Sequence, residues 1–158
     1  MMETPDLRLR AFEKSDDAEV TSWFPDAGAV RFFAGKRLKW PLTAEQWDGI
    51  RSDETLTAWT AILGDDTGAV GHGELVRETE SVVRLARLAV APAVRGRGVG
   101  RALVAALVAM SRANGYSRAT LTVHPDNANA IRAYRGLGFR PVSEQGAKEL
   151  RMELDLTK

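Results

Sequence analysis

The chain has 158 residues, 44% of them hydrophobic, and its 22 basic and 21 acidic residues give a formal net charge of +1 at pH 7. This length fits one domain over residues 1–158 with a substantial core, and the near-zero charge argues against a nucleic-acid or anionic-membrane partner. The absence of cysteine excludes disulfides, a cysteine nucleophile and thiolate metal sites, and two histidines are too few for a histidine-rich metal site.

The sequence also argues against a membrane or secreted location. The N-terminal residues MMETPDLRLR contain no apolar core of the kind that a signal peptide needs. The longest apolar run, residues 102–110, is about half of the ~20 residues that span a bilayer. We therefore expect a cytoplasmic protein.

The N-terminal third predicts a strand followed by two helices. Apolar and polar residues alternate over residues 7–12, as in a strand with two different faces. Ser15 is expected to cap the first helix, and Pro25 to end it. Thr43 and Gln46 have capping-box spacing, which predicts the start of a second helix.

The remaining elements alternate between strands and helices. Residues 57–63 and 69–77 predict a hairpin, residues 81–90 a third consecutive strand, and residues 98–113 a long helix. Further on we expect a strand over 120–123, a helix over 127–137, and strands over 139–142 and 150–156. Antiparallel hairpins with helices packed on the sheet indicate an α/β or α+β domain.

The most informative segment is the glycine-rich turn between the strand ending at Val90 and the long helix. Glycines at alternate positions, Gly96, Gly98 and Gly100, allow close backbone approach to a ligand, and the free N–H groups of the helix start point to the same place. The arginines of this turn add cationic side chains suited to a pyrophosphate: Arg95, Arg97 and Arg101. The alternative is a tight turn with solvated arginines.

Two other phosphate-binding loops fit the turn poorly. The dinucleotide fingerprint needs a third glycine where Arg101 stands, and the P-loop pattern G-x-x-x-x-G-K is absent.

With a second motif downstream, the chain resembles the GNAT superfamily of acyl-CoA N-acyltransferases. The first GNAT signature, [Q/R]-x-x-G-x-[G/A], is matched by Arg95, Gly98 and Gly100. The second, N-x-x-A-x-x-x-Y-x-x-x-G-F, is matched by Asn127, Ala130, Tyr134, Gly138 and Phe139. The resemblance is firm from residue 69 to 142 and weak from 23 to 57.

The resemblance implies a mixed, mostly antiparallel sheet of six to seven strands, flanked by about four helices and splayed between strands four and five. It also implies acetyl-CoA as cosubstrate, with no metal, its pantetheine arm lying in the splay. Leu88 and Val90 would pair with the arm like a strand, and Asn127 and Tyr134 would lie on its other side. The whole cofactor-binding set is Leu88, Val90, Arg95, Gly96, Arg97, Gly98, Val99, Gly100, Arg101, Asn127 and Tyr134.

Two residues are the candidates for catalysis. Tyr134, a phenol with an ordinary pKa of ~10, can protonate the leaving thiolate or donate a hydrogen bond to it; the alternative is a tyrosine packed on a helix face.

Some GNAT enzymes carry a carboxylate on strand four that acts as the catalytic base, but residues 84–87 contain none. Glu74, on one strand face with His72, can serve as a base through water, or is a solvated glutamate without a role. His124 is a weaker candidate.

The acceptor site is expected in the N-terminal segment where the resemblance fades. Aromatic residues crowd there and form either core or pocket: Trp23, Phe24, Phe32, Phe33, Trp40 and Trp47. Asp26 is a candidate partner for the acceptor amine.

The expected function is transfer of an acetyl group to a primary amine, a small molecule or a peptide N-terminus, by direct attack in a ternary complex. Whether the domain forms a homodimer stays open. A non-catalytic acyl-CoA sensor is the alternative, and Tyr134 argues against it because a sensor needs no proton donor. A nucleic-acid module on the arginines is disfavoured by the net charge and by the lack of interleaved aromatics.

Overall fold

The computed structural model describes residues 5–142 and 148–158. In these residues seven strands form one sheet in the order β1-β2-β3-β4-β5-β7-β6, and all neighbours are antiparallel except β4 and β5. The strands are β1 (Leu7–Ala11), β2 (Leu56–Leu63), β3 (Gly71–Arg77), β4 (Val82–Val90), β5 (Arg118–Val123), β6 (Arg140–Pro141) and β7 (Leu150–Asp155). The mixed, mostly antiparallel sheet confirms the predicted fold class.

Five α-helices and two 3-10 turns accompany the sheet in the described residues. The helices are α1 (Asp17–Ser22), α2 (Ala27–Ala34), α3 (Ala44–Ser52), α4 (Val99–Ala113) and α5 (Ala128–Gly136). The turns are η1 (Lys14–Asp16) and η2 (Pro92–Val94). The capping pair predicted for the second helix is confirmed, because Thr43 Oγ1 accepts from the N–H of Gln46 at 3.3 Å.

Two N-terminal expectations need correction. The helix α2 was not predicted, since it is short and carries Gly28 in its first turn; it is capped by Asp26, whose Oδ1 accepts from the N–H of Ala29 at 2.8 Å. Ser15 is not a cap, because it lies inside η1, where the capping box is formed by Glu13 and Asp16. The helix starts in this segment are therefore set by Asp26 and by the pair of Glu13 and Asp16.

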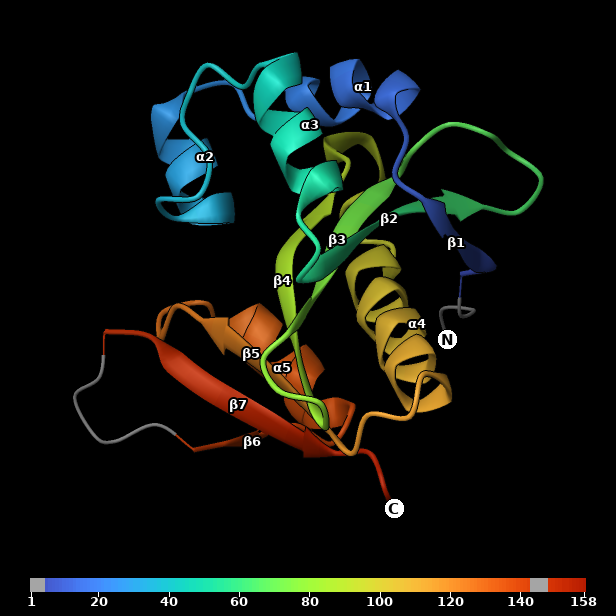
Figure 1. Cartoon of the computed structure of the whole chain (residues 1–158), viewed down its shortest axis with the longest axis vertical. Helices are drawn as coiled ribbons and strands as arrows, with labels where there is room; N and C mark the ends of the chain where they lie inside the picture. Colours follow the sequence, from blue (N-terminus) through green and yellow to red (C-terminus); the bar gives the residue numbers. More distant parts are fainter. Residues whose placement is uncertain (1–4, 143–147) are drawn as a thin grey trace.

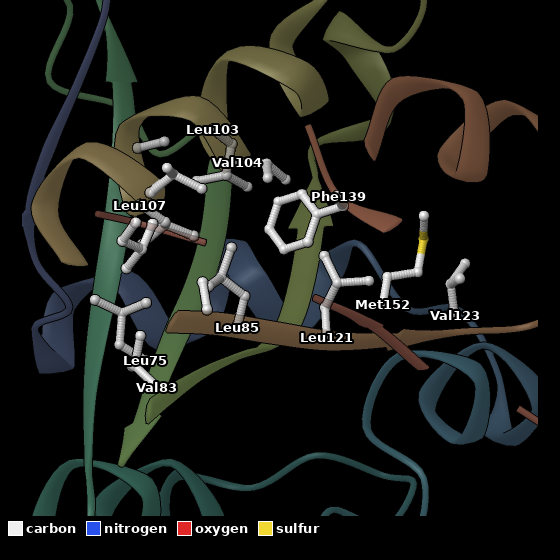
Figure 2. Close-up of a cluster of buried hydrophobic side chains, with 14 residues drawn as sticks. Leu75, Val83, Leu85, Leu103, Val104, Leu107, Leu121, Val123, Phe139 and Met152 are labelled. Atoms are coloured by element: carbon white, nitrogen blue, oxygen red, sulfur yellow. The ribbon is translucent and has the colours of Figure 1, made fainter. Parts of the chain in front are cut away.

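Helices cover the sheet on both faces, and each face has its own hydrophobic core. In Figure 1, α1, α2 and α3 gather at one end of the molecule, whereas α4 and α5 lie on the other side of the strands. The core on the α4 side includes Leu103 and Leu107 of α4, Leu75 of β3 and Leu121 of β5, and Figure 2 shows them in one cluster that also contains Phe139 and Met152.

The second core lies between the sheet and the layer of α1, α2 and α3. Its largest fully buried side chain is Trp47, which packs against Phe12 in an edge contact with ring centroids 5.3 Å apart. Asp16 ties this layer to the sheet: it accepts two bonds of 2.8 Å from Arg10 and one of 3.0 Å from Thr60. Burial alone would raise the pKa of Asp16, but these hydrogen bonds and that from the Glu13 N–H hold it below its ordinary value.

The strands β4 and β5 part soon after they begin to pair. Val82, Val83 and Arg84 are paired with Arg118, Ala119 and Thr120. Beyond these pairs β4 continues to Val90 and β5 to Val123 without pairing to each other, and the two ribbons diverge in Figure 1. The splay expected between strands four and five is confirmed.

A bulge in β4 lies within the unpaired stretch. On β3 one residue, Gly73, separates His72 from Glu74, but their partners on β4 are Ala89 and Ala86, with two residues between them. The extra residue is accommodated at Arg87, whose φ of 46° is left-handed. Opposite the bulge, Gly73 lets Leu107 of α4 approach the backbone, because a Cβ there would stand 2.7 Å from Leu107 Cδ1.

We therefore expect Gly73→Ala to overpack the core and to cost about 1–3 kcal/mol, since Leu107 is fully buried and has little room to move. This corresponds to a Tm lower by about 3–10 °C. The matched control is Gly49→Ala in α3, where an added Cβ meets nothing within 4 Å and helix propensity should gain about 0.5–1 kcal/mol. Thermal unfolding followed by circular dichroism measures both, and an equal Tm in the two variants would contradict the close packing at Gly73.

Candidate active site

The glycine-rich turn presents a row of free backbone donors at the start of α4. Gly96 and Gly98 have φ values of 80° and 78°, and Gly98 is the N-cap residue of the helix. Within the described residues, the N–H groups from Gly96 to Arg101 have no hydrogen-bond acceptor, and the first bond of the helix is donated by Ala102 to the carbonyl of Gly98. Because the helix dipole adds partial positive charge here, the turn is suited to bind an anion.

The three arginines of the turn point in different directions. Arg95 Nε donates to the carbonyl of Val90 at 3.3 Å, and Arg101 Nη2 donates to the carbonyl of Gly136 at 3.4 Å. Arg97 borders a hollow of about 430 Å³ that also includes Asp65 and Asp66. The bond from Arg101 places the last turn of α5 beside the first turn of α4.

Beyond Arg84 the edge of β4 that faces the gap is not paired with β5, and the carbonyl of Val90 on this edge accepts only a long bond of 3.3 Å from the side chain of Arg95. Ala91 donates its N–H to Val70, on the β3 side, at 2.8 Å. Successive residues of a strand point their backbone groups to opposite edges, so those of Leu88 and Val90 point away from β3 and into the gap. Both residues thus have the orientation that pairing with an extended ligand requires.

Tyr134 lies on α5 with its ring half-buried against the α4-side core. The ring meets Phe139 edge-on with centroids 6.1 Å apart. Burial raises the pKa of the Tyr134 phenol above its ordinary value of 10.0, so the hydroxyl keeps its proton at neutral pH. No hydrogen-bond acceptor for it lies in the described part of the chain, which leaves it free to donate to a ligand.

Asn127 is the N-cap of α5 rather than a residue of its first turn. Its Oδ1 accepts from the N–H of Ala130 at 3.3 Å. The side-chain amide N–H groups have no acceptor among residues 5–142 and 148–158 and remain available as donors. The expected contact of Asn127 with the arm stays a prediction.

Glu74 is not a solvated strand residue, as one interpretation of the sequence had it. Its side chain is 0% exposed. Oε2 accepts from His72 Nε2 at 2.8 Å, and Oε1 accepts from Arg87 Nε at 2.5 Å. Both carboxylate oxygens are therefore engaged, and an acceptor amine has no direct access to either. The role of Glu74 as a water-mediated base stays a prediction.

The remaining candidates divide between core and surface. Trp23 and Trp47 are buried in the core beneath α1–α3, whereas Phe32 of α2 and Trp40 are exposed. Asp26 is engaged as a helix cap. His124 is exposed and bonded through Nδ1 to the N–H of Asp126 at 3.1 Å.

Among the described residues, no group of three or more His, Cys, Asp or Glu side chains is placed to hold a metal ion. None of the helices in the described ranges has the length and apolar character needed to cross a membrane.

The chain is similar in sequence to a known protein family. The model of the acetyltransferase (GNAT) family matches residues 17–139, most of the chain. The chain belongs to the GNAT family. It is 32% identical over 139 residues to a mycothiol acetyltransferase of Corynebacterium kroppenstedtii, covering 84% of this chain and 33% of that protein. A mycothiol acetyltransferase of Beutenbergia cavernae is 43% identical over 141 residues, covering 86% and 46% respectively. The chain thus spans less than half the length of these curated relatives.

A solved structure shows the same GNAT fold. Spermidine N-acetyltransferase from Vibrio cholerae, crystallised with CoA and spermine, superposes with a TM-score of 0.81 at 16% identity and covers 97% of each chain. At this identity the likeness concerns the fold alone.

The sequence predicted only part of the cluster of His72, Glu74 and Arg87. The period-2 spacing put His72 and Glu74 on one strand face, but no sequence signal located the bulge that brings Arg87 to them.

If the turn at Gly98 binds the pyrophosphate of CoA, Gly98→Asp should weaken acetyl-CoA binding by much more than ~10-fold, because the side chain places negative charge at the anion site and strains a φ of 78°. Isothermal titration calorimetry measures this. Ala93→Asp, which adds the same charge at an exposed residue of η2, should change the affinity by less than ~3-fold. Equal affinity in a folded Gly98→Asp variant would rule out the anion-binding role.

Proposed function

We propose that the chain is an acetyl-CoA-dependent N-acetyltransferase that acetylates a primary amine by direct attack in a ternary complex. The observation that carries this proposal is the row of free N–H groups from Gly96 to Arg101, placed next to the gap between β4 and β5. One end of the gap binds a pyrophosphate, and the open edge of β4 binds an extended arm. Membership of the GNAT family and the acetyltransferase relatives support the same conclusion.

We assign each group a role that its position supports. The N–H groups from Gly96 to Arg101, together with Arg95, Arg97 and Arg101, hold the pyrophosphate. The backbone of Leu88 and Val90 pairs with the pantetheine arm, and Asn127 and Tyr134 lie across the arm from β4. The arm then directs the thioester along the gap toward the α1–α3 layer, where the acceptor binds.

The reaction needs one bond to form and one to break. The neutral amine nitrogen attacks the thioester carbonyl carbon, and the tetrahedral intermediate collapses by breaking the C–S bond. The departing thiolate takes a proton or a hydrogen bond from the Tyr134 hydroxyl. The amine nitrogen loses a proton to water, and where Tyr134 has given up its proton, water returns one to it. Because burial raises the pKa of Tyr134, the donor is protonated throughout the neutral and mildly alkaline range.

A non-catalytic acyl-CoA sensor is the second candidate. It is favoured by the absence of a carboxylate on β4 and by the engagement of both Glu74 oxygens. Release of free CoA thiol from acetyl-CoA, measured against a panel of small amines and peptides, separates the two functions. An acetyltransferase turns over with at least one amine, whereas a sensor binds acetyl-CoA and releases no thiol.

For Tyr134→Phe we expect kcat to fall by about 10²–10⁴-fold with little change in acetyl-CoA affinity, because one donor oxygen is lost and the packing against Phe139 is kept. The ratio of wild-type to mutant rate should stay constant as the pH rises toward 10, and should shrink only when the wild-type phenol titrates above that value. Tyr116→Phe, the other tyrosine of the chain, is the matched control. A Tyr134→Phe kcat within ~3-fold of wild type would show that Tyr134 is a packing residue.

A further inference from the structure

Arg87 has an unusual backbone conformation for its residue type. Among the described residues it is the only one other than glycine with a positive φ, 46°. An L-residue is strained in this region and stays there only when its surroundings hold it. Asn and Asp, whose short side chains bond locally, tolerate the left-handed region, but arginine has no such compensation. The structure must therefore supply a contact that keeps residue 87 left-handed.

That contact is the ion pair with Glu74. Arg87 Nε donates to Glu74 Oε1 at 2.5 Å, and the arginine side chain is only 9% exposed. Glu74 stands on β3 directly beside the bulge, opposite Ala86. The pair thus bridges the two strands at the place where their register shifts.

Glu74 is itself fixed on its other side. His72 Nε2 donates to Oε2 at 2.8 Å, and the imidazole is fully buried in edge contact with Phe12, with ring centroids 4.7 Å apart. His72 Nδ1 has no hydrogen-bond partner within the described residues. In the part of the chain that the structure describes, Glu74 is therefore the only polar contact of this ring, and the aromatic rings packed around the imidazole restrict its movement.

We propose that Glu74, supported by His72, is a positioning residue: its ion pair holds Arg87 left-handed and so fixes the direction of the β4 backbone that follows. This inference rests on the proposed function, because the groups that it directs, those of Leu88 and Val90, are the ones assigned to the pantetheine arm. Without the ion pair between Glu74 and Arg87, residue 87 would leave the left-handed conformation and the bulge in β4 would change. The backbone groups of Leu88 and Val90 would then no longer face the gap at the same positions.

The same contacts argue against Glu74 as the base. A base must reach the amine proton directly or through one water, and here both oxygens are occupied and the side chain is fully buried. The two roles differ in a measurable way. Loss of a base is offset as the acceptor amine deprotonates at high pH, whereas loss of a positioning contact acts on binding at every pH.

The decisive comparison is between alanine and glycine at position 87. Glu74→Gln is combined with each, so that no unpaired charge is left buried, giving Glu74→Gln/Arg87→Ala and Glu74→Gln/Arg87→Gly. The two double variants lack the ion pair equally and differ only by a Cβ, which disfavours the left-handed region in alanine but is absent in glycine. We expect acetyl-CoA affinity, measured by calorimetry, to fall ~10-fold or more in the alanine variant and to recover by at least ~3-fold in the glycine variant. Lys14→Ala, at an exposed ion pair with Asp48, is the control and should bind as wild type.

Each outcome decides the proposal. Equal affinities of the alanine and glycine variants, with wild type binding normally, would overturn the positioning role and leave the proposed function standing. A wild-type protein that does not bind acetyl-CoA would overturn both. If either double variant fails to unfold cooperatively, the isosteric Glu74→Gln alone decides: a loss of acetyl-CoA affinity that is the same from pH 6 to 9 supports positioning, and unchanged affinity with a rate that recovers at high pH establishes the base instead.

Discussion

The structure depends on the parting of β4 from β5 after Val82, Val83 and Arg84 have paired. Parallel neighbours that separate leave backbone donors and acceptors without partners on both facing edges, and such groups need water or a ligand to satisfy them. The glycine-rich turn that follows β4 adds the unpaired N–H groups at the start of α4. Edge and turn are consecutive in the chain, so one extended ligand with an anionic group can satisfy both.

A left-handed residue, a buried ion pair and a closely packed glycine lie together on the β3 side of β4. A left-handed L-residue costs about 1–2 kcal/mol, and Arg87 adopts this conformation at the bulge. Removing one partner of a buried ion pair costs about 3–5 kcal/mol, so the cluster of Glu74, Arg87 and His72 resists change once it is formed. Gly73 lies on β3 opposite the bulge, where the absence of a side chain allows α4 to pack closely against the strand. The strained backbone at Arg87 lies beside the gap that the ligand is proposed to fill. Strained backbone conformations tend to occur at functional sites.

The sequence predicted the features that depend on local pattern. The turn and α4 followed from glycine spacing and an apolar run, and the capping pair of Thr43 and Gln46 located α3. The splay and the assignment of Tyr134 came from resemblance to a family rather than from residue chemistry. Family membership is confirmed by the match to residues 17–139, whereas the role of Tyr134 remains to be tested.

The features that the sequence did not predict depend on tertiary contacts. The short helix α2 gains its stability from packing Val30 and Ala34 into the core, which no local signal encodes. Glu74 looked exposed because charged strand residues usually are, and its burial requires Arg87, thirteen positions later, to turn back across a bulge. A bulge of this kind is set by the partner strand and α4, so the residues of β4 alone do not reveal it.

One gap, formed by the β4 edge and the α4 N-terminus, is proposed to hold CoA. A crystal structure of the protein with CoA tests it most directly. We expect pyrophosphate oxygens within about 2.7–3.2 Å of backbone N–H groups between Gly96 and Arg101, and the pantetheine amides bonded to the backbone of Leu88 and Val90. A CoA molecule bound away from the gap, or one whose pyrophosphate meets only arginine side chains in solvent, would contradict it.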